Sequence, residues 1–270
     1  IANAHTVFNV SNTLIFIGFA GQFARLVEWL VPDKPIEEVI IAEPKYLDEV
    51  LLETPSLALD RARLELGHMG EHVREMLRRI MPAIHSGNPT MLTEVAQIDD
   101  AVDILHGHIV TYLGHISRKA LTDEKTRELV NLMSAVNELE NIGDIIETDL
   151  GALGFKRIED GVSLSDATRA MLDNLNKMIS SAADQAMIAV TEKNPESAER
   201  VIDMKSEINR LMDSAAMHDA KRLVAEEPNL LVANTIEMDI IEKLKRIYYF
   251  SKRMAKAVAF LPDENAEEVA

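Results

Sequence analysis

The sequence has no cysteine, few aromatic residues and a large excess of negative charge. Among its 270 residues there is no Cys, 4% are aromatic, and the formal net charge at pH 7 is -17. Without cysteine the chain can form no disulfide, Cys-ligated zinc site, thiolate-held iron–sulfur cluster or cysteine nucleophile. A nucleic acid backbone requires a basic surface, so we expect no nucleic acid partner.

The abundant residues favour helix over strand, since Leu, Ala, Ile, Val, Met, Glu, Asp and Lys dominate. Proline, glycine and capping residues divide the chain after residue 57 into successive segments. We predict six helices at about 57–85, 89–119, 123–153, 165–193, 195–226 and 229–260. No segment alternates polar and apolar residues, so we predict an all-α fold without a sheet.

The two ends of the chain differ from this helical region. Residues 1–31 include a run from Thr6 to Ala24 without a charged residue, close to the roughly 20 residues that span a bilayer. We predict a terminal transmembrane helix there, with a buried helix of a soluble protein as the alternative. Four prolines in 32–57 predict a linker, and 263–270 form an acidic tail. Because the first residue is not Met, we interpret the chain as a fragment or processed product.

The helical region repeats itself weakly. Val95–Leu105 resembles Val201–Leu211, and Leu139–Ile142 resembles Leu244–Ile247 at an offset of 105 residues. We therefore expect two repeated three-helix bundles. They make up one domain at 58–262, with halves at about 58–154 and 163–262. The third segment carries a heptad seam that should pack against neighbouring helices: Leu129, Leu132, Val136, Leu139, Gly143, Ile146, Leu150 and Leu153.

Acidic residues recur at helical spacing on two segments. Glu140, Asp144 and Glu147 lie at i, i+4 and i+7 on the third segment, and so share one face. Asp99, Asp103 and His106 have the same spacing on the second. Two facing acidic stripes would provide hard oxygen ligands for a divalent or trivalent cation, and His106 could add a nitrogen. The candidate metal ligands are Glu140, Asp144, Glu147, Asp99 and Asp103; a solvated acidic face is the alternative.

The sixth segment is basic. No acidic residue follows its first lysine before Asp263, and its cations are Lys243, Lys245, Arg246, Lys252, Arg253 and Lys256. One interpretation is that this helix neutralises the acidic segments of the same chain. The other is an anion site for phosphate, a nucleotide or the anionic inner leaflet, with candidate residues Lys245, Arg246, Lys252 and Arg253.

Catalytic motifs are absent from the sequence. The glycines form neither a Walker loop nor a GxGxxG motif, the serines lack a GxSxG context, and the histidines lack HExxH spacing. We therefore predict no catalytic residue and no enzymatic activity.

Nearly the whole chain resembles bacterial sodium/phosphate cotransporters that carry a PhoU-like domain. Ala2–Phe19 is similar to the end of their second membrane repeat, Pro44–Leu59 to the linker that follows, and 58–260 to the PhoU domain. That domain has two three-helix bundles, each with an E(D)xxxD motif on its third helix. Glu140–Asp144 matches the first motif.

The second motif departs from the family pattern. Lys245 and Tyr249 stand where its two carboxylates would lie. The resemblance implies that PhoU-like domains can bind metal clusters through the paired motifs, so a metal such as Mg, Mn or Fe is expected in the first bundle only. A cation would not bind beside a lysine, and tyrosine is neutral near pH 7.

The resemblance also implies a function. The chain would be the cytoplasmic PhoU-like regulatory domain of a sodium-dependent inorganic phosphate cotransporter, unable to transport alone. Its partners would be a transmembrane transport domain, phosphate and sodium through the full transporter, the membrane, and a second copy in a homodimer. We expect it at the inner membrane, with 32–270 cytoplasmic. The alternatives are a free-standing PhoU-like phosphate-signalling adaptor and a ligand-free helical dimerisation scaffold.

Overall fold

The computed structural model describes residues 16, 19, 42–222 and 230–259. The chain divides into two compact units, Ile1–Val39 and Ile40–Ala270. The predicted membrane helix at 1–31 lies outside the described residues except for two exposed phenylalanines, and the acidic tail lies wholly outside them. Within the described residues, no helix combines the length and the apolar character that a membrane span requires.

Every regular element in the described part of the second unit is helical, which confirms the predicted all-α fold. Residues 42–222 and 230–259 contain no strand. The elements are a 3-10 helix η1 (Glu49–Glu53), α2 (Pro55–Ser86), α3 (Pro89–Ile116), α4 (Asp123–Asp144), a π-helix η2 (Ile145–Leu150), α5 (Gly151–Glu159), α6 (Asp166–Thr191), α7 (Pro195–Asp203), α8 (Lys205–Arg222) and α9 (Leu230–Ala259).

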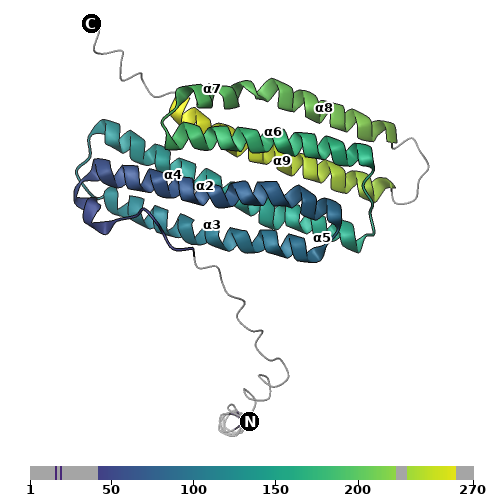
Figure 1. Cartoon of the computed structure of the whole chain (residues 1–270), viewed down its shortest axis with the longest axis horizontal. Helices are drawn as coiled ribbons and strands as arrows, with labels where there is room; N and C mark the ends of the chain where they lie inside the picture. Colours follow the sequence, from purple (N-terminus) through teal and green to yellow (C-terminus); the bar gives the residue numbers. More distant parts are fainter. Residues whose placement is uncertain (1–15, 17–18, 20–41, 223–229, 260–270) are drawn as a thin grey trace, which may run out of the picture. The chain divides into compact units, whose positions relative to one another are not determined.

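The second unit is built from two groups of long helices that lie side by side (Figure 1). The first group contains α2, α3 and the continuous run α4–η2–α5, and the second contains α6, α7 with α8, and α9. Across the two groups, α2 packs against α6 and α4 packs against α9. The seam predicted on α4 and η2 is buried from Leu129 through Leu150. Apolar burial on both sides therefore joins the groups through one core.

The helices begin where capping residues predict. Each of four polar side chains accepts a hydrogen bond from a backbone N–H in the first turn that follows it, which satisfies a donor that the helix itself cannot pair. These caps are Asn88 on α3, Thr122 on α4, Ser165 on α6 and Asn194 on α7. The order and starts of these four helices were therefore readable from the sequence.

The predicted end of the third helix, at about residue 153, is wrong. The chain does not leave the helix near residue 153, because α5 carries it through Gly151 and Gly154 to Glu159. A Cβ atom at Gly154 would lie 2.7 Å from Leu92 Cδ2 on α3. That glycine therefore permits close packing between α5 and α3 instead of ending the helix. The fifth predicted helix also differs, since it is interrupted at Met204 between α7 and α8.

The described end of the predicted linker is attached to the first bundle. The backbone N–H groups of Lys45 and Tyr46 donate to Oε2 of the buried Glu65, at 2.8 and 2.6 Å. The hydroxyl of Tyr112 donates to the carbonyl of Asp48 at 2.7 Å. These bonds fix the entry to η1 and α2, so this part of the linker is a structural element of the domain.

Candidate metal centre

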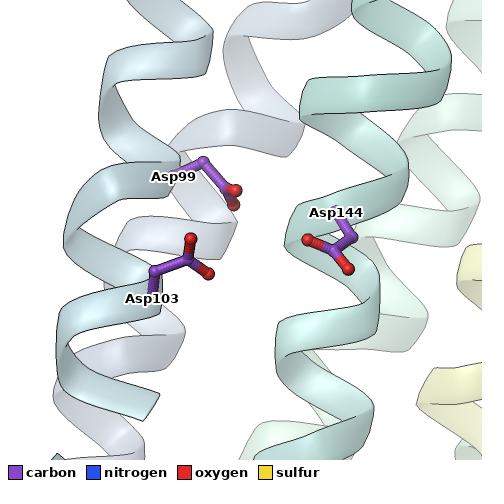
Figure 2. A group of neighbouring side chains, drawn as sticks. All are labelled: Asp99, Asp103 and Asp144. Carbon is purple, nitrogen blue, oxygen red and sulfur yellow. The ribbon is translucent and has the colours of Figure 1, made fainter. Parts of the chain in front are cut away.

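Three aspartates from two helices meet in the first bundle. Asp99 and Asp103 come from α3 and Asp144 is the last residue of α4. One carboxylate oxygen from each lies within 4.8 Å of the other two. Figure 2 shows the three carboxylates pointing toward one another in the space between the two helices. The structure thus brings together three of the five predicted metal ligands.

Local structure on α4 makes this meeting possible. A Cβ atom at Gly143 would lie 2.5 Å from Asp99 Oδ1, so a side chain larger than hydrogen would occupy the space of the Asp99 carboxylate. The π-helix η2 begins directly after Asp144 and contains Glu147. A π-helical turn is wider than an α-helical one and is common at functional sites. Here it separates the acidic end of α4 from α5.

Asp99 is in an unfavourable environment for a carboxylate. Its side chain is buried, with 4% of the residue exposed, and Oδ1 has no hydrogen-bond partner. Burial, followed by the negative charges of Asp103, Glu147, Asp144 and Asp100, raises the pKa of Asp99 to about 7. An isolated buried charge is costly unless a counter-ion or hydrogen bonds offset it. A cation between the aspartates would supply that missing partner.

The neighbouring acids share this negative field. Burial, with the charges of Asp144 and Glu147, raises the pKa of Asp103, and burial with the charge of Asp144 raises the pKa of Glu140. His106 opposes both shifts. Its Nε2 lies 3.0 Å from Asn137 Oδ1, so the predicted nitrogen ligand already has a partner on α4.

Glu140 and Glu147 flank the three aspartates without joining their close group. Both are half-buried, and the Thr148 hydroxyl donates to Glu147 Oε2 at 2.9 Å. Charge spacing selected all five acids but could not rank them. The ranking depends on the register of α3 against α4, which Gly143 permits.

The donor set fits a hard cation. Three carboxylates supply oxygen ligands, which Mg²⁺, Mn²⁺ and Fe³⁺ favour over soft ligands. Such ions commonly complete their coordination with water or further carboxylates, and Glu140 and Glu147 are the nearest acidic candidates on α4 and η2. A bound ion would also lower the pKa of Asp99, because the metal requires its ionised form.

The basic helix α9 makes ion pairs with acids of the first bundle. Arg253 lies 2.7 Å from Glu138, whose side chain is 4% exposed. Arg246 and Lys243 lie 3.1 and 3.4 Å from Asp149. Two of the four candidate anion-binding residues, the arginines, therefore have acidic partners in the chain. The other two, Lys245 and Lys252, have no ion-pair partner among residues 42–222 and 230–259.

Comparison with known proteins agrees with this architecture. The family model described as PhoU domain matches residues 66–148, which include the three aspartates. PhoU from Pseudomonas aeruginosa superposes with a TM-score of 0.70 at 18% identity, covering 76% of this chain and 97% of that one. The fold is PhoU-like. The phosphate transport system regulatory protein PhoU from Streptococcus pneumoniae gives a TM-score of 0.67 at 15% identity, covering 77% of this chain and 96% of that one.

Sequence relatives match the chain over a longer span. The protein named "Putative inorganic phosphate export protein YjbB" of Salmonella typhimurium is 24% identical over 97% of this chain. The protein of the same name in Escherichia coli K12 is 23% identical over 97% of it. In both cases the match covers 48% of the relative, so the chain spans about half the length of these proteins.

Proposed function

We propose that this chain is the regulatory PhoU-like domain of an inorganic phosphate carrier. The observation that carries the proposal is the extent of the similarity to proteins named for phosphate export, which reaches 97% of this chain and includes residues outside the PhoU-like bundle. A free regulatory protein would be expected to match over the helical domain alone. The absence of catalytic motifs agrees with regulation rather than catalysis.

The proposal includes the membrane part of the carrier. Residues 1–31 would form the last transmembrane helix and 32–270 would lie on the cytoplasmic side of the inner membrane. The full carrier would couple phosphate to sodium, as the resemblance of the first residues to sodium/phosphate cotransporters implies. The names of the relatives indicate export, so the direction of transport is part of what must be measured. A second copy of the chain is a further candidate partner.

Regulation would act through the three aspartates. A hard metal ion held by Asp99, Asp103 and Asp144 would tie α3 to the end of α4 and replace the missing partner of the Asp99 carboxylate. Because α4 continues through η2 into α5, and α4 also packs against α9, a change at this point can move both halves of the domain. The chain's own residues would therefore couple ion binding to the position of α9.

The test uses the whole carrier in membrane vesicles. Phosphate flux in both directions is measured with and without sodium, for the wild type, for a variant without residues 58–262, and for Asp99→Asn/Asp144→Asn. We expect phosphate flux in all three proteins. The change in flux that added phosphate or Mn²⁺ causes in the wild type should be absent from both variants. The proposal is wrong if the wild type carries no phosphate, or if both variants respond as the wild type does. Flux that is independent of sodium would overturn the cotransporter part alone.

A further inference from the structure

The basic face of α9 occupies the position in the second half that the acidic face of α4 occupies in the first. At the repeat offset of 105 residues, Lys245, Tyr249 and Lys252 correspond to Glu140, Asp144 and Glu147. The alignment of Val95–Leu105 with Val201–Leu211 places Lys205 at the position of Asp99. The pseudo-repeat therefore places lysines where Asp99, Glu140 and Glu147 stand in the first half, and a tyrosine where Asp144 stands. Charge spacing on α9 alone cannot reveal the lysine on α8.

The structure brings these lysines toward one region. The hydroxyl of Tyr248 donates to the carbonyl of Val201 at 3.0 Å, which fixes α9 against the last turn of α7. Lys252 lies one helical turn after Tyr248, and Lys205 lies one turn after Val201. Because α9 runs back along α7 and α8 (Figure 1), and helical side chains lean toward the start of their own helix, the two lysines lean toward each other.

Contacts at Tyr248 agree with this geometry. Lys252 Nζ lies 5.6 Å from the centre of the Tyr248 ring, within the range of a cation–π contact. Burial, followed by the positive charges of Lys205 and Lys256, lowers the pKa of Lys252. Lys256 is one turn further along α9 and leans back toward Lys252. The positive charges of Lys205 and Lys256 therefore both act on Lys252, which lies between them.

The three lysines are unpaired within the part of the chain that the structure describes. In 42–222 and 230–259, Lys205, Lys252 and Lys256 form no ion pair, whereas Arg246 and Arg253 on the same helix are paired with Asp149 and Glu138. Burial, followed by the negative charge of Asp203, raises the pKa of Tyr248 to about 12. In a chain with a net charge of -17, an unpaired basic cluster is a local exception.

We propose that Lys205, Lys252 and Lys256 form a binding site for a phosphate group, either free inorganic phosphate or the phosphate of a lipid headgroup. Ammonium groups bind phosphate as point charges, and a dianion among three of them would remove their mutual repulsion. The half-buried Lys252 and the Tyr248 ring would form the floor of the site, with Lys205 and Lys256 at its rim. This site is independent of the aspartates and of any metal.

The experiment measures binding of inorganic phosphate to the purified chain by calorimetry and by the shift in Tm, in EDTA and at constant ionic strength. The wild type is compared with Lys205→Gln/Lys252→Gln and with the control Lys177→Gln, which removes an exposed lysine of α6. We expect at least tenfold weaker phosphate binding in the double variant and none of this loss in the control. Because the variant removes repulsion, its Tm without phosphate should equal or exceed that of the wild type.

A second arm separates the two sources of phosphate. Flotation with phosphatidylcholine vesicles, with and without phosphatidic acid, is measured for the same three proteins. Vesicle binding that requires phosphatidic acid and both lysines, without binding of free phosphate, supports the site and assigns it to a lipid. Wild-type binding to neither probe overturns the proposal, as does equal binding by the wild type and the double variant. Phosphate binding that survives Asp99→Asn keeps this result separate from the proposed metal site.

Discussion

The third helix of the first bundle and the third helix of the second bundle have the same place in the fold but opposite charge. On α4 and η2, Glu140, Asp144 and Glu147 lie beside a buried apolar seam. On α9, Lys245, Tyr249 and Lys252 occupy the corresponding positions beside an equally buried seam. The apolar positions are constrained by the core, whereas the polar face is free to change sign.

The two bundles also differ at the position of Gly143, where α4 approaches α3. Gly143 leaves room for the Asp99 carboxylate, and its counterpart at the offset of 105 is Tyr248, which is buried and bonded to Val201. At these corresponding positions the second half has neither the carboxylates nor the space that a metal centre of the first kind needs. The two proposed sites would let two related bundles bind ligands of opposite charge.

The largest effect is expected from the pH dependence of the first site. Because the pKa of folded Asp99 is about 7 and its usual value is 3.8, the metal-free protein loses stability as pH rises through this interval. At pH 8, Asp99→Asn should raise the free energy of unfolding by up to about 4 kcal/mol, because each unit of raised pKa corresponds to about 1.4 kcal/mol. Urea unfolding in EDTA at pH 5 and 8 measures this.

The control is Asp213→Asn, which removes an exposed carboxylate of α8. It should leave the free energy of unfolding nearly unchanged at both pH values. The free energy of unfolding could instead depend on pH identically in the wild type and Asp99→Asn. That result would show that burial of the Asp99 carboxylate does not destabilise the fold, and the two bundles would then not differ in this electrostatic cost.

A smaller effect on stability is expected from the ion pairs between α9 and the first bundle. Arg253→Met leaves the buried Glu138 carboxylate without its partner, and should lower the free energy of unfolding by about 2–3 kcal/mol. Arg246→Met breaks a pair with Asp149, whose carboxylate is more exposed than that of Glu138, and should cost less than about 1 kcal/mol. Equal losses in urea unfolding would contradict the expectation that burial of Glu138 makes its ion pair with Arg253 the stronger of the two.

An effect smaller than that of Arg253→Met is expected from the space at Gly143. In Gly143→Ala the new Cβ would meet Asp99 Oδ1, so the carboxylate must move, at a cost of about 1–2 kcal/mol. The control is Gly107→Ala on α3, where nothing lies within 4 Å, and there the higher helix propensity of alanine should raise stability by up to about 1 kcal/mol. Thermal unfolding of both variants decides the matter; a stabilised Gly143→Ala would exclude the close approach.

Much of the fold was predictable because its signals are local. Asn88, Thr122, Ser165 and Asn194 cap the helices that follow them, as their sequence context indicates. The continuation through Gly154 was not predictable, since the glycine responds to Leu92 on another helix. The break at Met204 carries no proline or glycine, and so gives no signal in the sequence.

The acids of the candidate site could be predicted from the sequence, but their burial could not. Helical spacing selected the acids on two segments, and three of them converge. Burial of Asp99, and the roles of Gly143 and Asp100 around it, depend on how α3 lies against α4. Lys205 is likewise invisible to spacing on one helix, because only the repeat alignment places it opposite α9. Contacts between distant segments thus account for what the sequence leaves open.

We expect the first bundle, and not the second, to hold a hard metal ion. Calorimetric titration of the metal-free chain with Mn²⁺ measures this for the wild type, Asp99→Asn/Asp144→Asn and Lys205→Gln/Lys252→Gln. We predict a single class of site in the wild type, loss of binding by at least tenfold in the aspartate variant, and unchanged binding in the lysine variant. Equal Mn²⁺ affinity in the wild type and the aspartate variant would show that Asp99 and Asp144 hold no metal ion.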